Sequence, residues 1–373
     1  MSGSPESEAM ERALALAARG WGRVSPNPLV GAVVVKDGCI VGEGFHAELG
    51  AAHAEVAALA EAGKQAIDGS LFVTLEPCRH HGRTPPCTDA IIAAGIRQVS
   101  YAVSDPTQPA GGGAAELRTA GIAVDRGLLA ADVVGLIAPF LWKARTGRPF
   151  VDLKLALSAD GAIAARPGQR TTISGPESWG EVHRLRAGAD AIVVGRRTVE
   201  ADDPLLTPRG TPLPRVAPLR VVLDAGARLD PTCTLVRTAG ETAVLVLAAR
   251  DAPSDRVQGL ESAGVEVLEV PRTAGGYLDP AAVLQRLGDR GAQCVLIEGG
   301  ARVAQSFLAA GLVERYHEFR GPDRFGPDSV PGPKDAPRGE QGGWRLASTT
   351  ETGTDMYKIW ERVAAFDAML EAA

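Results

Sequence analysis

Hydrophobic and polar positions in the first hundred residues follow helix-like and strand-like spacings in turn. Apolar residues three and four positions apart predict a helix from Ser7 to Arg19. Apolar runs predict strands at Ala32–Lys36 and Cys39–Phe45, joined by the hairpin turn signal Asp37-Gly38. The same patterns predict helices at 53–62 and 87–94, strands at 70–75 and 98–103, and two helical stretches after them. This order predicts an α/β sandwich.

A polar stretch without periodicity, 143–149, interrupts this pattern and carries Gly147 and Pro149. We interpret it as a linker between a domain at 1–145 and a second at 150–373. Strands are expected at 150–157, 191–194, 220–224, 243–248, 265–270 and 294–298, and helices at 177–187, 254–263, 280–287 and 302–309. Their alternation predicts a second sheet with crossover connections. Residues 321–343, rich in Gly, Pro and charge, predict a long loop.

Composition narrows the classes of function. A length of 373 residues favours two domains, and the net charge of −6 argues against a nucleic-acid groove. Apolar runs such as Val33–Val35 are far too short to span a membrane, and the acidic start of the chain does not resemble a signal peptide. Five cysteines with no disulfide pattern favour a reduced, cytoplasmic location. We therefore expect small-molecule chemistry, with no nucleic-acid or membrane partner.

Candidate chemistry is concentrated between His53 and Cys87. His53-Ala54-Glu55 precedes Pro77-Cys78 and Pro86-Cys87, a spacing close to the H-x-E…P-C-x-x-C pattern of zinc deaminases. One imidazole and two thiolates supply three zinc ligands and leave a fourth position for water, as in catalytic sites. Glu55 is then the expected general acid and base. The chain departs from the pattern because eight residues, not two, separate the cysteines.

Two motifs in the second half are weaker. A loop from Gly195 to Arg209 carries Asp202-Asp203, and an apolar strand ends in Glu298-Gly299-Gly300 where a helix begins. Free amides at a helix start suit phosphate, but the motif is not G-x-G-x-x-G and does not indicate a Rossmann site. Each motif by itself is more often ordinary loop or strand-to-helix connection.

Taken together, these segments resemble the bifunctional riboflavin-biosynthesis deaminase–reductase family. The resemblance runs from about Glu8 to Leu312 and rests on Ser25–Ala32, the Cys78–Cys87 segment with its insert, and Ser158-x-Asp160-Gly161, besides the motifs above. It implies hydrolytic deamination of 2,5-diamino-6-ribosylamino-4(3H)-pyrimidinone 5′-phosphate, then NADPH-dependent reduction of its ribosyl chain to a ribityl chain. It also implies a cytidine-deaminase-like α/β sandwich with zinc, followed by a dihydrofolate-reductase-like α/β domain.

The resemblance also implies roles for individual residues. Zinc is expected at His53, Cys78 and Cys87, with Glu55 catalytic. Substrate is expected at Asn27, His46, His80 and Arg83 in the deaminase, and at Arg186, Asp203, Leu206, Arg209 and Glu298 in the reductase. Of these, Arg186 and Arg209 are expected to pair with the substrate phosphate. NADPH is expected at Lys154, Thr198, Asp202, Gly299, Gly300, Ala301, Arg302 and Val303.

Several alternatives stay open at this point. Leu157 and the stretch 170–172 depart from the family pattern near the expected cofactor, so a deaminase with a weakened second domain is the main alternative. A nucleic-acid base deaminase is disfavoured by the acidic charge. A structural zinc site is disfavoured because no fourth ligand stands at a suitable spacing. The resemblance suggests a homo-oligomer, a dimer or a tetramer.

Overall fold

The computed structural model describes residues 4–80, 85–108, 110–210, 213–340 and 342–371. The chain forms two compact units, Met1–Gly147 with Phe366–Ala373, and Arg148–Ala365. Within the described residues, every helix is too short or too polar to cross a lipid bilayer.

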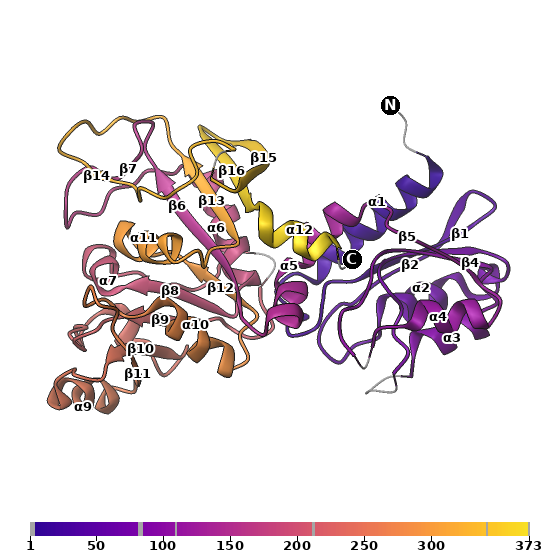
Figure 1. Cartoon of the computed structure of the whole chain (residues 1–373), viewed down its shortest axis with the longest axis horizontal. Helices are drawn as coiled ribbons and strands as arrows, with labels where there is room; N and C mark the ends of the chain where they lie inside the picture. The colour runs from indigo at the N-terminus through magenta and orange to yellow at the C-terminus, as the bar shows by residue number, and fades with distance from the viewer. Residues whose placement is uncertain (1–3, 81–84, 109, 211–212, 341, 372–373) are drawn as a thin grey trace. The chain divides into compact units, whose positions relative to one another are not determined.

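The first unit is built on a five-stranded sheet with strand order β2-β1-β3-β4-β5. β1 pairs antiparallel with β2 and β3, whereas β3, β4 and β5 run parallel. α2, α3 and α4 cover one face, and α1 and α5 lie on the other (Figure 1). The strands are β1 (Gly31–Lys36), β2 (Cys39–Phe45), β3 (Ser70–Leu75), β4 (Gln98–Val103) and β5 (Ala123–Arg126). The helices are α1 (Pro5–Ala17), α2 (Ala54–Ala62), α3 (Cys87–Ala93), α4 (Gly113–Thr119) and α5 (Ala130–Thr146), with part of α12 (Val363–Glu371).

Glycine in β2 brings α2 unusually close to the sheet. A Cβ atom at Gly44 would lie 2.2 Å from the backbone oxygen of Ala54, the first residue of α2. No side chain fits in that space. The start of α2, which carries His53 and Glu55, is therefore held directly against β2.

The second unit contains a nine-stranded sheet with order β11-β10-β9-β8-β12-β6-β13-β16-β15. The strands from β11 to β13 run parallel, and β16 and β15 add antiparallel. The strands are β6 (Phe150–Leu157), β8 (Ala191–Gly195), β9 (Leu219–Leu223), β10 (Val244–Ala249), β11 (Glu266–Val270), β12 (Cys294–Ile297), β13 (Arg315–Arg320), β15 (Trp344–Thr352) and β16 (Asp355–Arg362). A short separate pair joins β7 (Ala162–Ala164) to β14 (Val330–Pro331).

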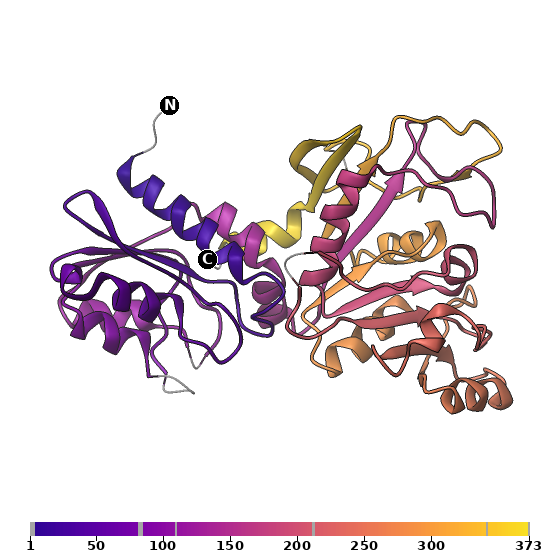
Figure 2. The same ribbon diagram turned by 180° about the vertical axis from the view of Figure 1, so that it is seen from behind.

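Helices cover both faces of this sheet, so it has a hydrophobic core on each side. α10 (Pro280–Asp289) and α11 (Ala301–Ala309) pack on the face seen in Figure 1, through Leu284 and Phe307. α6 (Pro176–Gly188), seen from behind in Figure 2, packs on the opposite face. α8 (Thr234–Arg237) and α9 (Ser254–Ser262) contribute to that second core, and α7 (Arg196–Asp202) follows β8. The prediction of two α/β domains is confirmed.

The structure differs from the predicted domain bounds in two places. The first is the expected linker at 143–149, of which the first four residues are the last turn of α5. Basic side chains there and Gly147 in the left-handed conformation (φ 72°) are helix-end signals that the polar composition masked. The second is the end of the chain, because Phe366 and the residues after it group with the first unit rather than with 150–373.

Candidate functional site

Three potential metal ligands converge at one edge of the first sheet. His53 is the N-cap residue of α2, Cys87 is the first residue of α3, and Cys78 follows the carboxyl end of β3. Their donor atoms all lie within 4.8 Å of one another. The two helix starts contribute partial positive charge, which favours thiolate over thiol at this place.

The donor set and its spacing fit zinc. The Nδ1 atom of His53 lies 3.2 Å from Sγ of Cys87 and 3.5 Å from Sγ of Cys78. Ligands in tetrahedral zinc sites, at roughly 2.0–2.3 Å from the metal, are themselves about 3.5 Å apart. The hydrogen bond between the two cysteines lowers the pKa of Cys78 and raises the pKa of Cys87, so Cys78 is the first of the pair to become a thiolate. The residues present therefore fit a zinc ion with three protein ligands.

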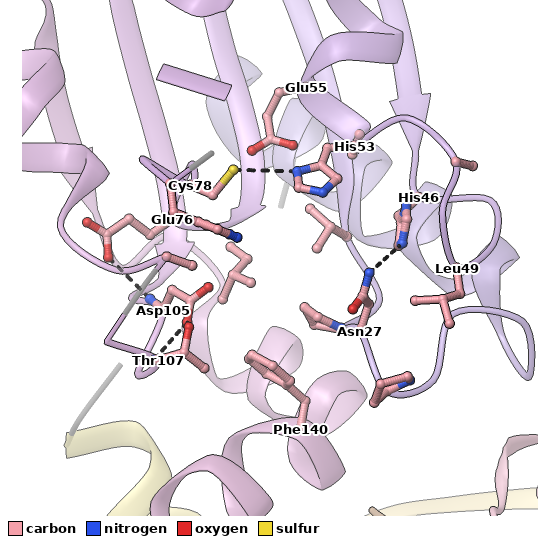
Figure 3. Close-up of a pocket in the computed structure, with 18 of the residues that line it drawn as sticks. Asn27, His46, Leu49, His53, Glu55, Glu76, Cys78, Asp105, Thr107 and Phe140 are labelled. Atoms are coloured by element: carbon pink, nitrogen blue, oxygen red, sulfur yellow. Dashed lines mark hydrogen bonds between the residues drawn. The ribbon is translucent and has the colours of Figure 1, made fainter. Parts of the chain in front are cut away.

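Glu55 lies beside these ligands without belonging to the set. It is in the first turn of α2, its residue is 4% exposed, and its carboxyl points into the same space as His53 and Cys78 (Figure 3). Burial raises the pKa of Glu55 to about 7. A carboxyl with this pKa can both accept and release a proton near neutral pH.

A cavity of about 500 Å³ opens in front of the ligands, a size suited to a small ligand. Asn27 and His46 line one side of it (Figure 3). Nδ1–H of His46 donates to the carbonyl of Ala52 (3.2 Å), so in the neutral ring Nε2 accepts from the amide NH₂ of Asn27 (3.1 Å). Burial lowers the pKa of His46, which keeps the ring neutral. The amide oxygen of Asn27 is thereby left as an acceptor.

Two further expected residues belong to the insert between the cysteines. His80 lines the cavity, and its buried Nδ1 has no hydrogen-bond partner among the described residues. Arg83 lies outside the described residues.

Sequence reasoning missed Asp105, which lines the cavity opposite Asn27 (Figure 3). Its Oδ1 accepts hydrogen bonds from the backbone N–H (2.8 Å) and the hydroxyl (2.6 Å) of Thr107. Glu76 accepts backbone N–H groups of Asp105, Gly112 and Ala114 and so orders the same loop. The signal in the sequence was Ser104-Asp105-Pro106, a polar group directly after the buried strand β4.

A second polar cluster lies in the second unit, at the carboxyl end of β12. Arg186 of α6 makes a bidentate ion pair with Glu298, at 2.7 and 2.8 Å, and both side chains are nearly buried. Burial opposes ionisation of Glu298, but Arg186 outweighs it and lowers the pKa of that carboxyl. Burial lowers the pKa of Lys154, whose ammonium lies 5.8 Å from the ring centres of both Trp179 and Phe319. Arg186 thus binds Glu298 through Nε and Nη2, and its expected pairing with the substrate phosphate stays a prediction.

The glycine pair after β12 allows the start of α11 to lie very close to its neighbours. A Cβ atom at Gly299 would lie 2.6 Å from Cβ of Val303, and the N–H of Gly300 donates to the hydroxyl of Thr198 (3.2 Å). Ala301, Arg302 and Val303 form the first turn of α11, whose amides have no intrahelical acceptor. A helix start with free amides suits the phosphates of a dinucleotide. The residues present therefore fit NADPH phosphates at this helix start.

The expected residues at the end of α7 and in the loop after it differ in burial and in their contacts. The pKa of Asp202 is raised by burial, against the attraction of Arg170 and Lys154. Arg209 is exposed, whereas Leu206 is 2% exposed within a hydrophobic core. Asp203 accepts hydrogen bonds from Thr234 through both carboxylate oxygens.

Comparison with protein families matches both halves of the chain. The RibD C-terminal domain matches residues 149–358, and the cytidine and deoxycytidylate deaminase zinc-binding region matches residues 4–103. The riboflavin biosynthesis protein RibD of Escherichia coli (strain K12) is 40% identical over 332 residues, which are 86% of this chain and 88% of that protein. The protein of the same name from Actinobacillus pleuropneumoniae is 40% identical over 319 residues, 85% of this chain and 84% of that protein.

Solved structures give the same result. Acinetobacter baumannii RibD (form 1) superposes with a TM-score of 0.81 at 33% identity, over 96% of this chain and 98% of that one. A diaminohydroxyphosphoribosylaminopyrimidine deaminase/5-amino-6-(5-phosphoribosylamino)uracil reductase from Thermotoga maritima superposes with a TM-score of 0.80 at 33% identity, over 96% and 99%.

Proposed function

Starting from the fact that the chain belongs to the RibD family of bifunctional riboflavin-biosynthesis enzymes, we propose which of its residues carry the two reactions. The predicted family and fold class are confirmed. The protein is a deaminase and reductase of riboflavin biosynthesis with Zn²⁺ and NADPH as cofactors, and it deaminates the diaminopyrimidinone ribosylamino 5′-phosphate before the ribosyl chain is reduced. None of the findings favours the alternative of an inactive second domain.

For deamination, the supporting observation is the convergence of His53, Cys78 and Cys87 with Glu55 beside them. Zinc held by the three ligands lowers the pKa of a water molecule and makes it nucleophilic. Glu55 accepts the proton of the attacking water and delivers it to the leaving amino nitrogen, because its raised pKa suits both transfers. These steps make Glu55 the catalytic residue of the deaminase.

The walls of the cavity hold the heterocycle. The amide oxygen of Asn27, fixed by His46, accepts an N–H of the pyrimidine. Oδ2 of Asp105 accepts another N–H from the opposite side, while Thr107 holds Oδ1. His80 and Arg83 bind the ribose phosphate, His80 through its Nδ1, which has no hydrogen-bond partner in the described part of the chain.

For reduction, NADPH supplies the hydride, and the residues of the second unit bind and orient. Thr198, Asp202, Lys154 and the segment Gly299–Val303 hold the cofactor, the segment through amides at the start of α11. Arg186 fixes the carboxylate of Glu298, which accepts hydroxyl groups of the sugar chain. Arg209, which is exposed, pairs with the substrate phosphate. The expected contact of Leu206 with substrate stays a prediction, since this side chain is 2% exposed within a hydrophobic core.

Two variants test these assignments in one preparation. Glu55→Gln removes the proton carrier, so we expect deamination to be lost while zinc content and NADPH-dependent reduction of supplied deaminated substrate persist. Arg209→Ala removes a phosphate partner, so we expect unchanged deamination and a raised KM for reduction. Product identification by mass spectrometry, with and without NADPH, and metal analysis provide the readouts. Loss of zinc in Glu55→Gln, or normal reduction kinetics in Arg209→Ala, contradicts the corresponding role.

The chain acts on a small phosphorylated pyrimidine. We further propose that it forms a homo-oligomer, a dimer or a tetramer, in the cytoplasm, as expected from the family resemblance and from cysteine usage. Sedimentation analysis of the purified protein measures the first, and a monomer at all concentrations contradicts it.

A further inference from the structure

The loop that follows α7 has a backbone shape that its residues do not favour. Asp203 and Leu206 both have positive φ angles, 40° and 53°. Aspartate adopts this left-handed conformation more readily than most residues, but for leucine it is unfavourable. Such strain persists only where surrounding contacts over-determine the backbone, and it gathers at functional sites. The contacts that impose this backbone shape therefore identify the residues that hold the loop in place.

Asp203 makes the first of these contacts. Its Oδ1 accepts the backbone N–H of Thr234 at 2.7 Å, and its Oδ2 accepts the hydroxyl of the same residue at 2.6 Å. The hydroxyl of Thr234 lowers the pKa of Asp203. Since both carboxylate oxygens bind the start of α8, Asp203 anchors the loop to that helix.

Arg220 makes the second contact from the core. Its side chain is fully buried, and Nη1 donates to the carbonyl of Leu205 at 3.3 Å. Its other hydrogen bonds go to Thr238 and to the carbonyl of Thr242, beyond the end of α8. Burial lowers the pKa of Arg220 against the attraction of Glu241, and no carboxylate of the described residues lies within ion-pair distance of it. A buried charge without an ion pair is costly, so the contribution of Arg220 lies in the carbonyls that it joins.

The loop after α7 is thus held at every second residue, at positions 203, 205 and 207. Asp203 binds Thr234, the carbonyl of Leu205 binds Arg220, and the carbonyl of Thr207 accepts Nη1 of Arg186 at 3.5 Å. Leu206, between these points, is buried in the core. α8, β9 and α6 together therefore set the backbone of residues 203–207.

We propose that Asp203 and Arg220 are positioning residues of the reductase, which hold this loop in the strained shape that keeps Asp202 and Arg209 in the cofactor and substrate site. The inference rests on the proposed function of Asp202 and Arg209. It replaces the expected role of Asp203 as a substrate contact. The two residues act through the backbone and touch neither NADPH nor substrate.

Variants at both ends of the Asp203–Thr234 contact test this, because both residues are outside the core strands. Asp203→Ala removes both hydrogen bonds, and we expect kcat/KM for reduction to fall between about tenfold and about a hundredfold, as for misplaced binding groups. Asp203→Asn retains an acceptor for the N–H and a donor for the hydroxyl, so we expect nearly normal kinetics. Thr234→Val should lower kcat/KM in the same direction, and the double variant should be no worse than Asp203→Ala. The deaminase rate of each preparation measures the amount of active first unit, and urea unfolding of each variant is the control for folding of the second unit.

The outcomes distinguish the positioning role of Asp203 from the substrate-binding role of Arg209. If Asp203→Asn is as impaired as Asp203→Ala while Thr234→Val is normal, Asp203 contacts substrate through its charge and the inference is wrong. Normal reduction by Asp203→Ala also overturns it, provided that Arg209→Ala is impaired. If Arg209→Ala is normal as well, the proposed substrate site has failed, and the inference falls with it.

Discussion

Asn27 shows how one neighbour decides what a single side chain can recognise. The neutral ring of His46 accepts the amide N–H of Asn27, so the carbonyl oxygen of Asn27 is available for a ligand. The reverse orientation would set the amide oxygen against the lone pair of Nε2. The recognition of an N–H group on the heterocycle thus depends on a tautomer fixed by the carbonyl of Ala52.

Replacing Asn27 by leucine tests this assignment. The variant loses one hydrogen bond of about 1 kcal/mol, so we expect KM for deamination to rise about fivefold. Zinc content and the reductase rate should not change, because Asn27 is neither a ligand nor part of the second unit. Steady-state kinetics measure the change, and an unaltered KM would show that the amide oxygen faces no substrate group.

Residues whose roles follow from a motif of nearby positions in the chain could be predicted from the sequence. His53, Glu55, Cys78 and Cys87 stand in a recognised spacing, and their convergence follows from two helix starts and one strand end. Asp105 has only a weak local signal, a polar residue just after β4, and its position in the cavity depends on a loop ordered by Glu76. The hydrogen-bond partner of Asp203 could not be predicted, because Thr234 is 31 positions away along the chain.

Among the elements, α11 combines packing with binding. Its first turn follows a glycine pair at the end of β12, and the absent Cβ of Gly299 lets Val303 approach the strand. The sequence indicated the strand, the glycines and the helix, because each has a local signal. It did not indicate that Thr198, at the neighbouring α7, would bind the N–H of Gly300.

Gly299→Ala should disturb this element selectively. The new methyl group would lie 2.6 Å from Cβ of Val303, so α11 must shift. Overpacking of this kind costs about 1–3 kcal/mol, and we expect KM for NADPH to rise about tenfold or more. Fluorescence titration with NADPH measures the affinity. Gly180→Ala on α6, where a Cβ meets no atom within 4 Å, is the matched control. Equal affinities in both variants would contradict a phosphate site at this helix start.

Stability of the molecule should depend on pH through Glu314. This carboxyl is 1% exposed and bonded to Arg148 and to the N–H of Val151, yet burial raises its pKa to about 7 from an ordinary value of 4.5. The folded state therefore holds a proton that the unfolded chain releases. The contribution of this proton to the free energy of unfolding is fully present below pH 4.5. It declines as pH rises toward 7 and is absent above pH 7.

Glu314→Gln removes this dependence. We expect the difference in the free energy of unfolding between wild type and variant to fall by up to about 3 kcal/mol from pH 4.5 to 7, and then to level off. Urea unfolding of both proteins across this range measures it. The exposed Glu351→Gln serves as the control for a lost charge. Parallel stability curves for wild type and Glu314→Gln would contradict the raised pKa.

The grouping of the final residues with the first unit has a practical consequence for dissecting the enzyme. Phe366 and Met369 are almost completely buried, although they lie more than two hundred positions after the break at Gly147. A fragment ending at that break would lack these side chains and expose the apolar surface that they cover. A fragment designed to carry the deaminase alone should therefore include residues 366–371 of α12, joined after Gly147, to keep that surface covered.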